Sequence, residues 1–400
     1  MQVHCPKGYR SGTHRACPPE ETLGRLKPRL ADFGITRVAN VTGLDRIGIP
    51  VVMVVRPNAM SLAVSQGKGA DLVSAQVSGI MESIEAWHAE NMTIATLLAP
   101  YHDIRARAVD VSRLPQPDNT RFTPDLPILW VEAVDWASGA RRLVPHEMVH
   151  TRYMRPAPPG SGSFLMSSNG LASGNHLAEA VLHGLCETVE RDATALWDAT
   201  SYEGRAAMRV ALDTVDDDLC RWLLERYQAA GIRTALWNAT TDVGLPCFIC
   251  LIVEDEASPA WKVAPEGWGM GCHPSRAVAL SRALTEAAQT RLTTIAGTRD
   301  DLHRANYVRF LTQAREQDLQ SLERDEAGQD FQAVPTWDTG DIGEDVARAC
   351  AQLGQAGCGD VLVVDLSRKD IGLAVARVLV PGLEGPSSSP RYQRGPRARR

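Results

Sequence analysis

Three stretches of the chain share one layout, a glycine-containing turn followed by a helical run with polar residues at positions i, i+4 and i+7. The triplets are Ser78-Glu82-Glu85, His183-Glu187-Glu190 and Arg282-Glu286-Gln289. On a helix with about 3.6 residues per turn, these offsets fall on one narrow stripe. The fold must therefore place three polar helix faces against solvent, a ligand or other polar groups. This pattern indicates either a repeated β–turn–α unit or three separate uses of one geometry.

Carboxylates dominate two of these stripes. The second helix carries Glu179 as well as Glu187 and Glu190 on one face, and like charges so placed repel one another. A cation is therefore expected over that face. A single Glu-x-x-Glu is usually a solvated surface, but its repetition on a shared layout favours a site. Mg²⁺ takes oxygen ligands and usually combines a few carboxylates with substrate phosphates. With Glu82 and Glu85 included, the acids predict two or more Mg²⁺ ions that bridge a nucleotide triphosphate.

The same regions supply groups for the rest of a nucleotide. Basic or amide side chains that could bind phosphate oxygens occur at five positions. Ser78 or Gln289 could bind the base or ribose, and Glu286 on the third helix is included among the nucleotide-binding residues. The five positions are Lys68, Asn175, Arg191, Arg282 and Arg291. No GxxxxGK[ST] phosphate loop occurs in the chain.

Composition excludes several other classes of protein. A net charge of −6 gives no overall basic field for nucleic acid. The longest apolar runs, such as 49–55, are too short to cross a bilayer, and residues 1–15 lack the apolar core of a secretion signal. The nine cysteines are scattered and odd in number, which favours a reducing compartment over a disulfide framework. We expect a cytoplasmic protein.

Local patterns predict both helices and strands. Helices are expected over 20–33, 70–88, 274–295 and 338–353, and strands over 35–41, 49–55, 128–134, 233–238, 246–254 and 361–365. Gly67–Gly69 and Gly267–Gly271 are interpreted as turns. The chain after Pro381 is rich in Pro, Ser and Arg, so we expect disorder there. The predicted organisation is an N-terminal arm with the first strands (1–60), a catalytic domain (61–380) and a disordered tail (381–400).

Two further motifs are interpreted as structural. His146-Glu147-Met148-Val149-His150 spells the HExxH zinc pattern, but Pro145 and Pro156 leave no room for the sustained helix that this pattern needs. A short surface helix is expected instead. Cys247 and Cys250 form a CxxC within a strand-like run, where residues i and i+3 point to opposite faces, so buried thiols are expected.

Several blocks closely resemble the YcaO family over roughly residues 7 to 380. The three motif blocks are SGIMESIEAWHAE, SSNGLASGNHLAEAVLHGLCETVERD and GCHPSRAVALSRALTEAAQTRL, and the segment GTHRACPPEETLGRLKPRLADFGITRVANVTGLDRIGIPVV is similar to the family's N-terminal part. The resemblance implies an α+β ATP-binding fold with repeated β/turn/helix units around a central nucleotide. It also implies ATP- and Mg²⁺-dependent phosphorylation of a peptide backbone amide oxygen, followed by nucleophilic attack on the amide carbon.

The resemblance also assigns roles to individual residues. Glu82, Glu85, Glu179, Glu187 and Glu190 match Mg²⁺ ligands, and Ser78, Asn175 and Arg191 match positions that line the nucleotide. Arg15 is similar in position to a basic residue that reaches the terminal phosphate. No catalytic side chain is assigned.

Finer features favour one branch of the family. The ending RYQRGPRARR lacks the PxPxP-like terminus common in azoline-forming cyclodehydratases, and no ThiF-like leader-binding domain is attached. GTHR, ITRVANVTGLDRIGIP and Gly297-Thr298-Arg299-Asp300-Asp301 resemble the TfuA-associated branch. We therefore expect thioamide formation with a TfuA-like partner, a sulfide donor and a precursor peptide or protein. A homodimer is also expected. An azoline-forming cyclodehydratase and a non-catalytic ATP-binding scaffold are the alternatives.

Overall fold

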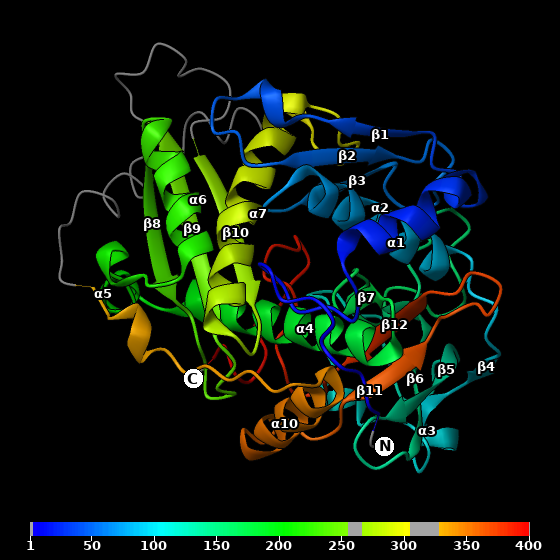
Figure 1. Cartoon of the computed structure of the whole chain (residues 1–400). Coiled ribbons are helices and arrows are strands. Elements are labelled where there is room, and N and C mark those ends of the chain that lie inside the picture. Colours follow the sequence, from blue (N-terminus) through cyan, green and yellow to red (C-terminus); the bar gives the residue numbers. More distant parts are fainter. Residues whose placement is uncertain (1–2, 255–265, 305–327, 400) are drawn as a thin grey trace.

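The computed structural model describes residues 3–254, 266–304 and 328–399. Helices and strands surround a central space, with α4 crossing the middle of the molecule (Figure 1). The principal helices are α1 (Pro19–Leu26), α2 (Leu72–Glu90), α4 (Leu177–Ala199), α6 (Asp218–Ala229), α7 (Arg276–Ala296) and α10 (Ile342–Gln355), with the short α3 (Tyr101–Ile104) and α5 (Tyr202–Ala207). Within these residues, every helix is too short or too polar to span a bilayer.

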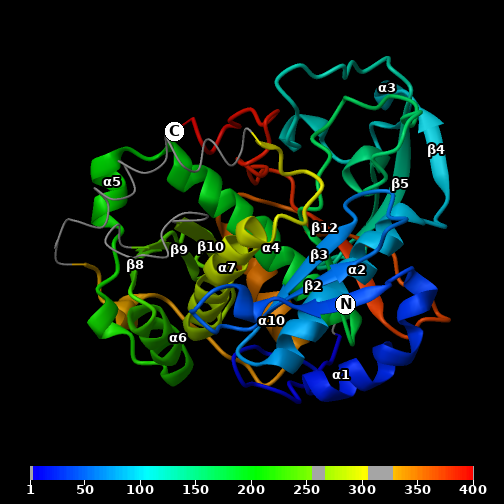
Figure 2. The same ribbon diagram turned by 90° about the horizontal axis from the view of Figure 1, so that it is seen from above.

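The strands form three antiparallel sheets. The first has the order β1-β2-β3, the second β10-β9-β8, and the third β4-β5-β11-β12-β7 with β6 paired to β5. Their bounds are β1 (Arg37–Asn40), β2 (Val51–Val55), β3 (Val64–Lys68), β4 (Thr96–Ala99), β5 (Ile128–Asp135), β6 (Arg141–Pro145), β7 (Leu171–Gly174), β8 (Ile232–Asn238), β9 (Cys247–Glu254), β10 (Glu266–Cys272), β11 (Leu362–Asp365) and β12 (Ala374–Leu379). Helices α7, α4 and α2 lie between the sheets, whereas α1 and α6 lie at the periphery (Figure 2).

Three strand–helix units organise the fold, as the repeated polar triplets predicted. In each unit an edge strand of one sheet leads through a short turn into a long helix, giving β3–α2, β7–α4 and β10–α7. The Asp71 carboxylate accepts a hydrogen bond from Ser74 N at the start of α2, and His176 Nδ1 accepts one from Ala178 N at the start of α4. Because all three strands are edge strands, their helices can converge on a common space.

Gly67 lies in β3 and Gly267–Gly271 lies in β10, so the prediction of turns at these positions was wrong, whereas Gly69 follows β3 in the connection to α2. A Cβ atom at Gly67 would lie 2.0 Å from Ala75 O, and one at Gly269 would lie 2.1 Å from Ala283 O. The helix backbone therefore packs directly against the strand, which only glycine allows.

The other predicted elements are largely confirmed. Helix α1 stops early because Pro28 cannot donate a backbone hydrogen bond, and the chain continues as a 3₁₀ helix over Lys27–Phe33. That segment ends at Gly34, whose φ of 70° is left-handed. Strands β3, β4, β6, β7, β10 and β12 were not predicted. The predicted boundary at residue 60 falls between β2 and β3 of a single sheet, so it is not a domain boundary.

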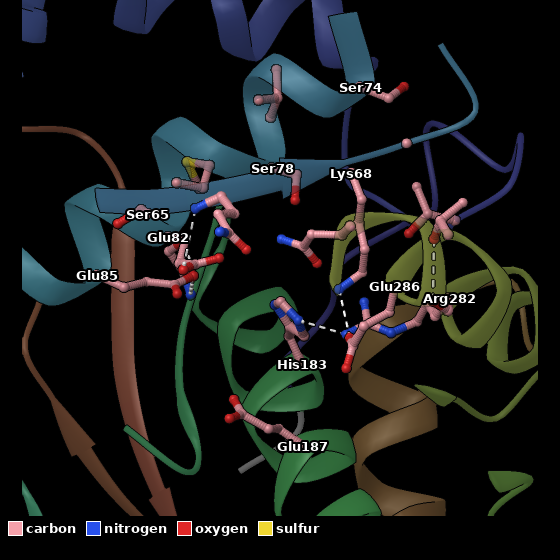
Figure 3. A pocket seen from close by; sticks show the side chains of 18 of the residues that line it. Ser65, Lys68, Ser74, Ser78, Glu82, Glu85, His183, Glu187, Arg282 and Glu286 are labelled. Carbon is pink, nitrogen blue, oxygen red and sulfur yellow. Dashed lines mark hydrogen bonds and ion pairs between the residues drawn. The ribbon is translucent and has the colours of Figure 1, made fainter. Parts of the chain in front are cut away.

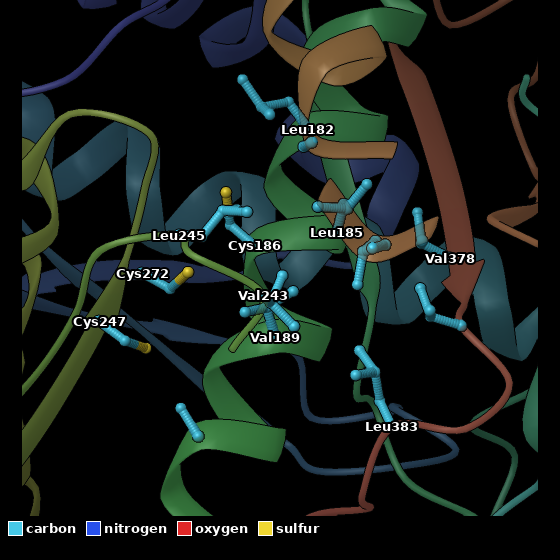
Figure 4. Close-up of a cluster of buried hydrophobic side chains, with 14 of the residues drawn as sticks. Leu182, Leu185, Cys186, Val189, Val243, Leu245, Cys247, Cys272, Val378 and Leu383 are labelled. Carbon is cyan, nitrogen blue, oxygen red and sulfur yellow. The ribbon is translucent and has the colours of Figure 1, made fainter. Parts of the chain in front are cut away.

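The apolar core anchors α4 from one side. Leu182, Leu185 and Val189 of α4 are buried against Val378 of β12 and Leu383 of the tail (Figure 4). Burial of side chains of this size contributes about 1.5–3 kcal/mol each. This packing fixes the helix, so its polar stripe is held in a defined orientation.

The two motifs interpreted as structural keep that role. His146–Met148 is one turn of 3₁₀ helix, and the Glu147 carboxylate accepts hydrogen bonds from Ser163 N at 3.0 Å and Phe164 N at 2.9 Å. Glu147 therefore holds a loop rather than acting as the base of a zinc site. Cys247 and Cys250 are buried in β9 and belong to different core clusters, as expected for opposite faces of a strand.

The tail is ordered in the structure, so the prediction of disorder after Pro381 was wrong. Arg397 Nε lies 2.9 Å from Asp192 Oδ1, and Arg397 Nη2 lies 3.0 Å from Asp192 Oδ2. Asp192 is fully buried on α4. The Glu384 carboxylate accepts hydrogen bonds from Gly395 N, Arg397 N and Ala398 N. The arginine-rich composition suggested a solvated tail, but one arginine neutralises a buried acid.

We expect Arg397→Ala to lower the free energy of unfolding by about 3 kcal/mol, because it leaves the Asp192 carboxylate buried without its cation. Arg391→Ala is the matched control, since this arginine is exposed and its guanidinium donates a hydrogen bond to Asn119. Urea unfolding followed by circular dichroism measures both. An equal, small loss in the two variants would show that the tail merely rests on the surface.

Candidate functional site

A cavity of about 630 Å³ lies where the three helices meet. Its walls come from α2, α4, α7, β3, β7 and the N-terminal segment around Tyr9–Arg15. All the predicted site residues except Arg291 line it. Figure 3 shows the α2, α4 and α7 side chains projecting towards one another across this space. A cavity of this size accommodates a cofactor-sized ligand.

The five predicted metal-binding acids lie on facing walls of the cavity. Glu82 and Glu85 come from α2, and Glu179, Glu187 and Glu190 from α4. Ser173 donates to Glu85 Oε1 from its backbone N at 2.8 Å and from Oγ at 2.6 Å. Cys272 N donates to Glu190 Oε2 at 3.0 Å, and Ala16 N donates to Glu179 Oε2 at 2.9 Å. These backbone contacts fix individual carboxylates without neutralising the group.

Burial makes the ionised form of these acids unfavourable. It raises the pKa of Glu85 to about 8 and that of Glu187 to about 7, and it also raises the pKa of Glu82 and Glu190. Lys68 lowers the pKa of Glu82, and Arg191 lowers the pKa of Glu187 and Glu190, but neither cancels the effect of burial. The protein's own cations therefore do not fully stabilise the ionised form of these acids.

Cationic side chains line the same cavity. Lys68 Nζ lies 2.6 Å from Glu286 Oε2, and Arg191 Nη2 lies 3.3 Å from Glu190 Oε1. Arg282 Nη2 lies 3.1 Å from His183 Nε2. The positions of these groups among the carboxylates suit a ligand that is itself anionic but carries cations, as a metal-bound polyphosphate does.

The N-terminal segment closes one side of the cavity. Thr22 Oγ1 donates to Asn175 Oδ1 at 3.0 Å, and Arg25 Nη2 donates to the same oxygen. Arg15 lies 3.9 Å from Glu179 through its Nε atom. Tyr9, Ser11, Gly12 and Thr13 also line the cavity. They were not predicted as site residues, because no pattern in the sequence distinguishes them. Thr151, Tyr153, Ser173 and Arg299 were missed for the same reason.

Arg291 is a correction to the predicted site. Its Nη2 lies 2.6 Å from Glu254 Oε2, and its Nε lies 3.5 Å from Asp45 Oδ2, so it joins α7 to β9 and to the turn before β2. It falls two residues after Gln289, which points it away from the helical stripe that lines the cavity. Arg291 is therefore a structural cation.

The donor set fits Mg²⁺ held jointly by protein and ligand. Within the part of the chain that the structure describes, no three His, Cys, Asp or Glu side chains are grouped closely enough to hold a metal alone. Mg²⁺ typically uses one or two carboxylates and completes its shell with water and substrate phosphates. The five acids lie on facing walls of the cavity, and four of them have raised pKa values. This arrangement matches a Mg²⁺ site that protein and ligand share.

Comparison with known proteins places the chain in a family. The model of the family described as YcaO cyclodehydratase, ATP- and Mg²⁺-binding, matches residues 66–384. A protein from Rhizobium leguminosarum bv. trifolii, described as an uncharacterized protein in the tfuA 3′ region, is 38% identical over 394 residues, which cover 96% of this chain and 92% of that protein. A protein from Methanothermobacter thermautotrophicus is 34% identical over 381 residues, covering 92% and 95% of the two chains.

Solved structures share the fold. YcaO from Methanopyrus kandleri, bound with AMPPCP and Mg²⁺, matches with a TM-score of 0.73 at 23% identity over 98% of both chains. A heterocyclase in complex with substrate and cofactor matches with a TM-score of 0.80 at 22% identity, over 96% of this chain and 54% of that one. The sequence resemblance is confirmed: this chain belongs to the YcaO family of ATP- and Mg²⁺-binding, peptide-modifying enzymes.

Proposed function

We propose that this protein uses ATP and Mg²⁺ to phosphorylate a backbone amide oxygen of a peptide or protein, and that sulfur then replaces that oxygen to give a thioamide. The observation that carries the activation step is the cavity itself. It brings the five predicted metal-binding acids, of which Glu85, Glu179 and Glu190 are buried, and five cationic side chains around one ligand-sized space. The cations are Arg15, Lys68, Arg191, Arg282 and Arg299.

Each group has a physical role in the proposed reaction. Mg²⁺ neutralises charge on the phosphates of ATP and on the phosphate that leaves. Glu82, Glu85, Glu179, Glu187 and Glu190 would hold these ions, and burial of the acids strengthens that attraction. Lys68 and Arg282 can donate to phosphate oxygens.

The sulfur step rests on the sequence features of the TfuA-associated branch and on the relative from the tfuA 3′ region. We propose a TfuA-like partner and a sulfide donor for this chain on that basis. Azoline formation is the second candidate, because the family model is described as a cyclodehydratase and a heterocyclase shares the fold. The scaffold alternative is disfavoured, because none of the five acids has been lost.

Product mass distinguishes the two chemistries. The protein is co-expressed with a TfuA-like protein and a candidate precursor peptide, and the peptide is weighed by mass spectrometry. We expect the peptide to gain the mass difference between one sulfur and one oxygen atom per modified amide. Loss of one water per modified residue would overturn thioamidation in favour of azoline formation.

Removal of one metal-binding charge tests the site separately. We expect Glu187→Gln and Glu190→Gln each to weaken Mg²⁺-dependent ATP binding by about 100-fold, as loss of a metal-ligand charge does. Because the pKa of Glu187 is raised to about 7, Gln resembles the protonated side chain and the fold should be kept.

Calorimetric titration measures that binding, and thermal melting checks the fold. Glu132→Gln is the matched control, since Glu132 is exposed on β5 and pairs with Arg141. Wild-type nucleotide affinity in both site variants would contradict the assignment of these acids to the metal site.

A further inference from the structure

One side of the central cavity opens to solvent and has an apolar wall. Tyr153 and Ser168 line the cavity there and are both exposed. The wall consists of Leu62, Ala86, Tyr153 and Leu302, and it is here called the mouth subsite. Tyr153 is 45% exposed, and the other three side chains are half-buried. Large apolar side chains that stay accessible inside a cavity can be covered by a ligand.

The mouth subsite is assembled from segments that are remote in sequence. Tyr153 N donates to Met60 O at 2.9 Å, and Ala63 N donates to Asp300 Oδ2 at 3.2 Å. Leu62 lies between these two anchored residues of the β2–β3 connection. It is therefore held next to the segment that carries Tyr153 and next to the loop that follows α7. These contacts give the wall a defined shape.

The mouth subsite adjoins the predicted metal-binding acids of α2. Thr151 Oγ1 donates to Ala86 O at 3.4 Å, so the segment that leads to Tyr153 packs on this helix. Ala86 follows Glu85 directly and lies one helical turn beyond Glu82, about 6 Å along the axis. Glu82 and Glu85 project from this stretch of α2 (Figure 3). A side chain bound in the subsite would therefore lie beside the proposed site of phosphate transfer.

Charges beside the subsite select against an acidic side chain. Asp300 and Asp301 lie on this side of the cavity and are both exposed. Arg299 also lines the cavity, but its Nε donates to Asp301 Oδ1 at 2.7 Å and its Nη2 donates to the same carboxylate. An acidic side chain would meet two carboxylates and a guanidinium that is already paired. An apolar side chain covers the leucines and Tyr153 without desolvating a charge of its own.

We propose that the mouth subsite binds the apolar side chain of a residue next to the activated amide of the peptide substrate. This inference rests on the proposed amide activation, whichever nucleophile follows. A peptide must bring one backbone amide to the phosphate at Glu82 and Glu85, and the exposed side of the cavity gives it access. The subsite fixes the register of the peptide, so that one amide rather than its neighbours is held at the reacting position.

Saturation-transfer NMR with short peptides tests the proposal without any reaction. The protein is first saturated with Mg²⁺ and a non-hydrolysable ATP analogue. The probes are pentaglycine peptides, blocked at both ends, whose central residue is leucine, glycine or aspartate. We expect the leucine peptide to bind about tenfold more tightly than the other two, which corresponds to partial burial of one leucine side chain.

Tyr153→Ala should reduce that preference to less than about threefold, because it removes the largest side chain of the subsite. Met154→Ala is the matched control, since Met154 is the next residue and is 52% exposed but does not line the cavity. It should keep the wild-type preference. If Tyr153→Ala fails to fold, Leu62→Ser replaces it with the same expected loss. Thermal melting and binding of the ATP analogue check each variant.

Three results would overturn the proposal. The first is equal binding, or no binding, of the leucine and glycine peptides by the wild type. The second is an unchanged preference in a folded Tyr153→Ala variant, and the third is an equal loss in Met154→Ala. Because no reaction takes place in this experiment, its failure leaves the proposed chemistry standing. A co-expressed peptide of unchanged mass would instead contradict the proposed reaction and not the binding preference.

Discussion

The crowding of carboxylic acids in the central cavity is the constraint on which the rest of the structure depends. Burial raises the pKa of four of the five acids, so the fold holds these side chains in an environment that does not favour their ionised form. Such an arrangement costs stability unless a ligand supplies cations. The cost is offset by the packing of α4 and by the close strand–helix contacts at Gly67 and Gly269, which hold the three helices together. Functional sites commonly retain charge of this kind at the expense of stability.

The two faces of α4 have different roles, one in the cavity and one in the packing of the tail. Glu187, Glu190 and Arg191 line the cavity, whereas Asp192, the next residue, is buried against the tail and neutralised by Arg397. A shift in the back of the helix would therefore move the acids on its front. Metal binding and the anchoring of the tail consequently share one rigid element.

The sequence predicted the convergence of the three polar stripes because spacing on a helix determines which side chains share a face. It also predicted most of the helices and half of the strands, but it missed β3, β7 and β10 of the three strand–helix units. It could not distinguish a glycine in a turn from a glycine in a strand, since Gly67 and Gly269 are required by the close packing of the following helix against the strand. Arg291 was assigned to the site although its partners, Glu254 and Asp45, are distant in sequence. The ordered tail depends on contacts between remote segments, which local composition does not encode.

The central claim is that the amide oxygen is activated by phosphorylation. It is tested most directly with a precursor peptide that carries ¹⁸O in its backbone amide, incubated with the protein, ATP, Mg²⁺ and the sulfide source. The account predicts that the heavy oxygen leaves with the phosphate, so that the inorganic phosphate recovered is labelled in proportion to the modified peptide. Unlabelled phosphate together with labelled water would contradict the account, because the oxygen would then have left without ever being bonded to phosphorus.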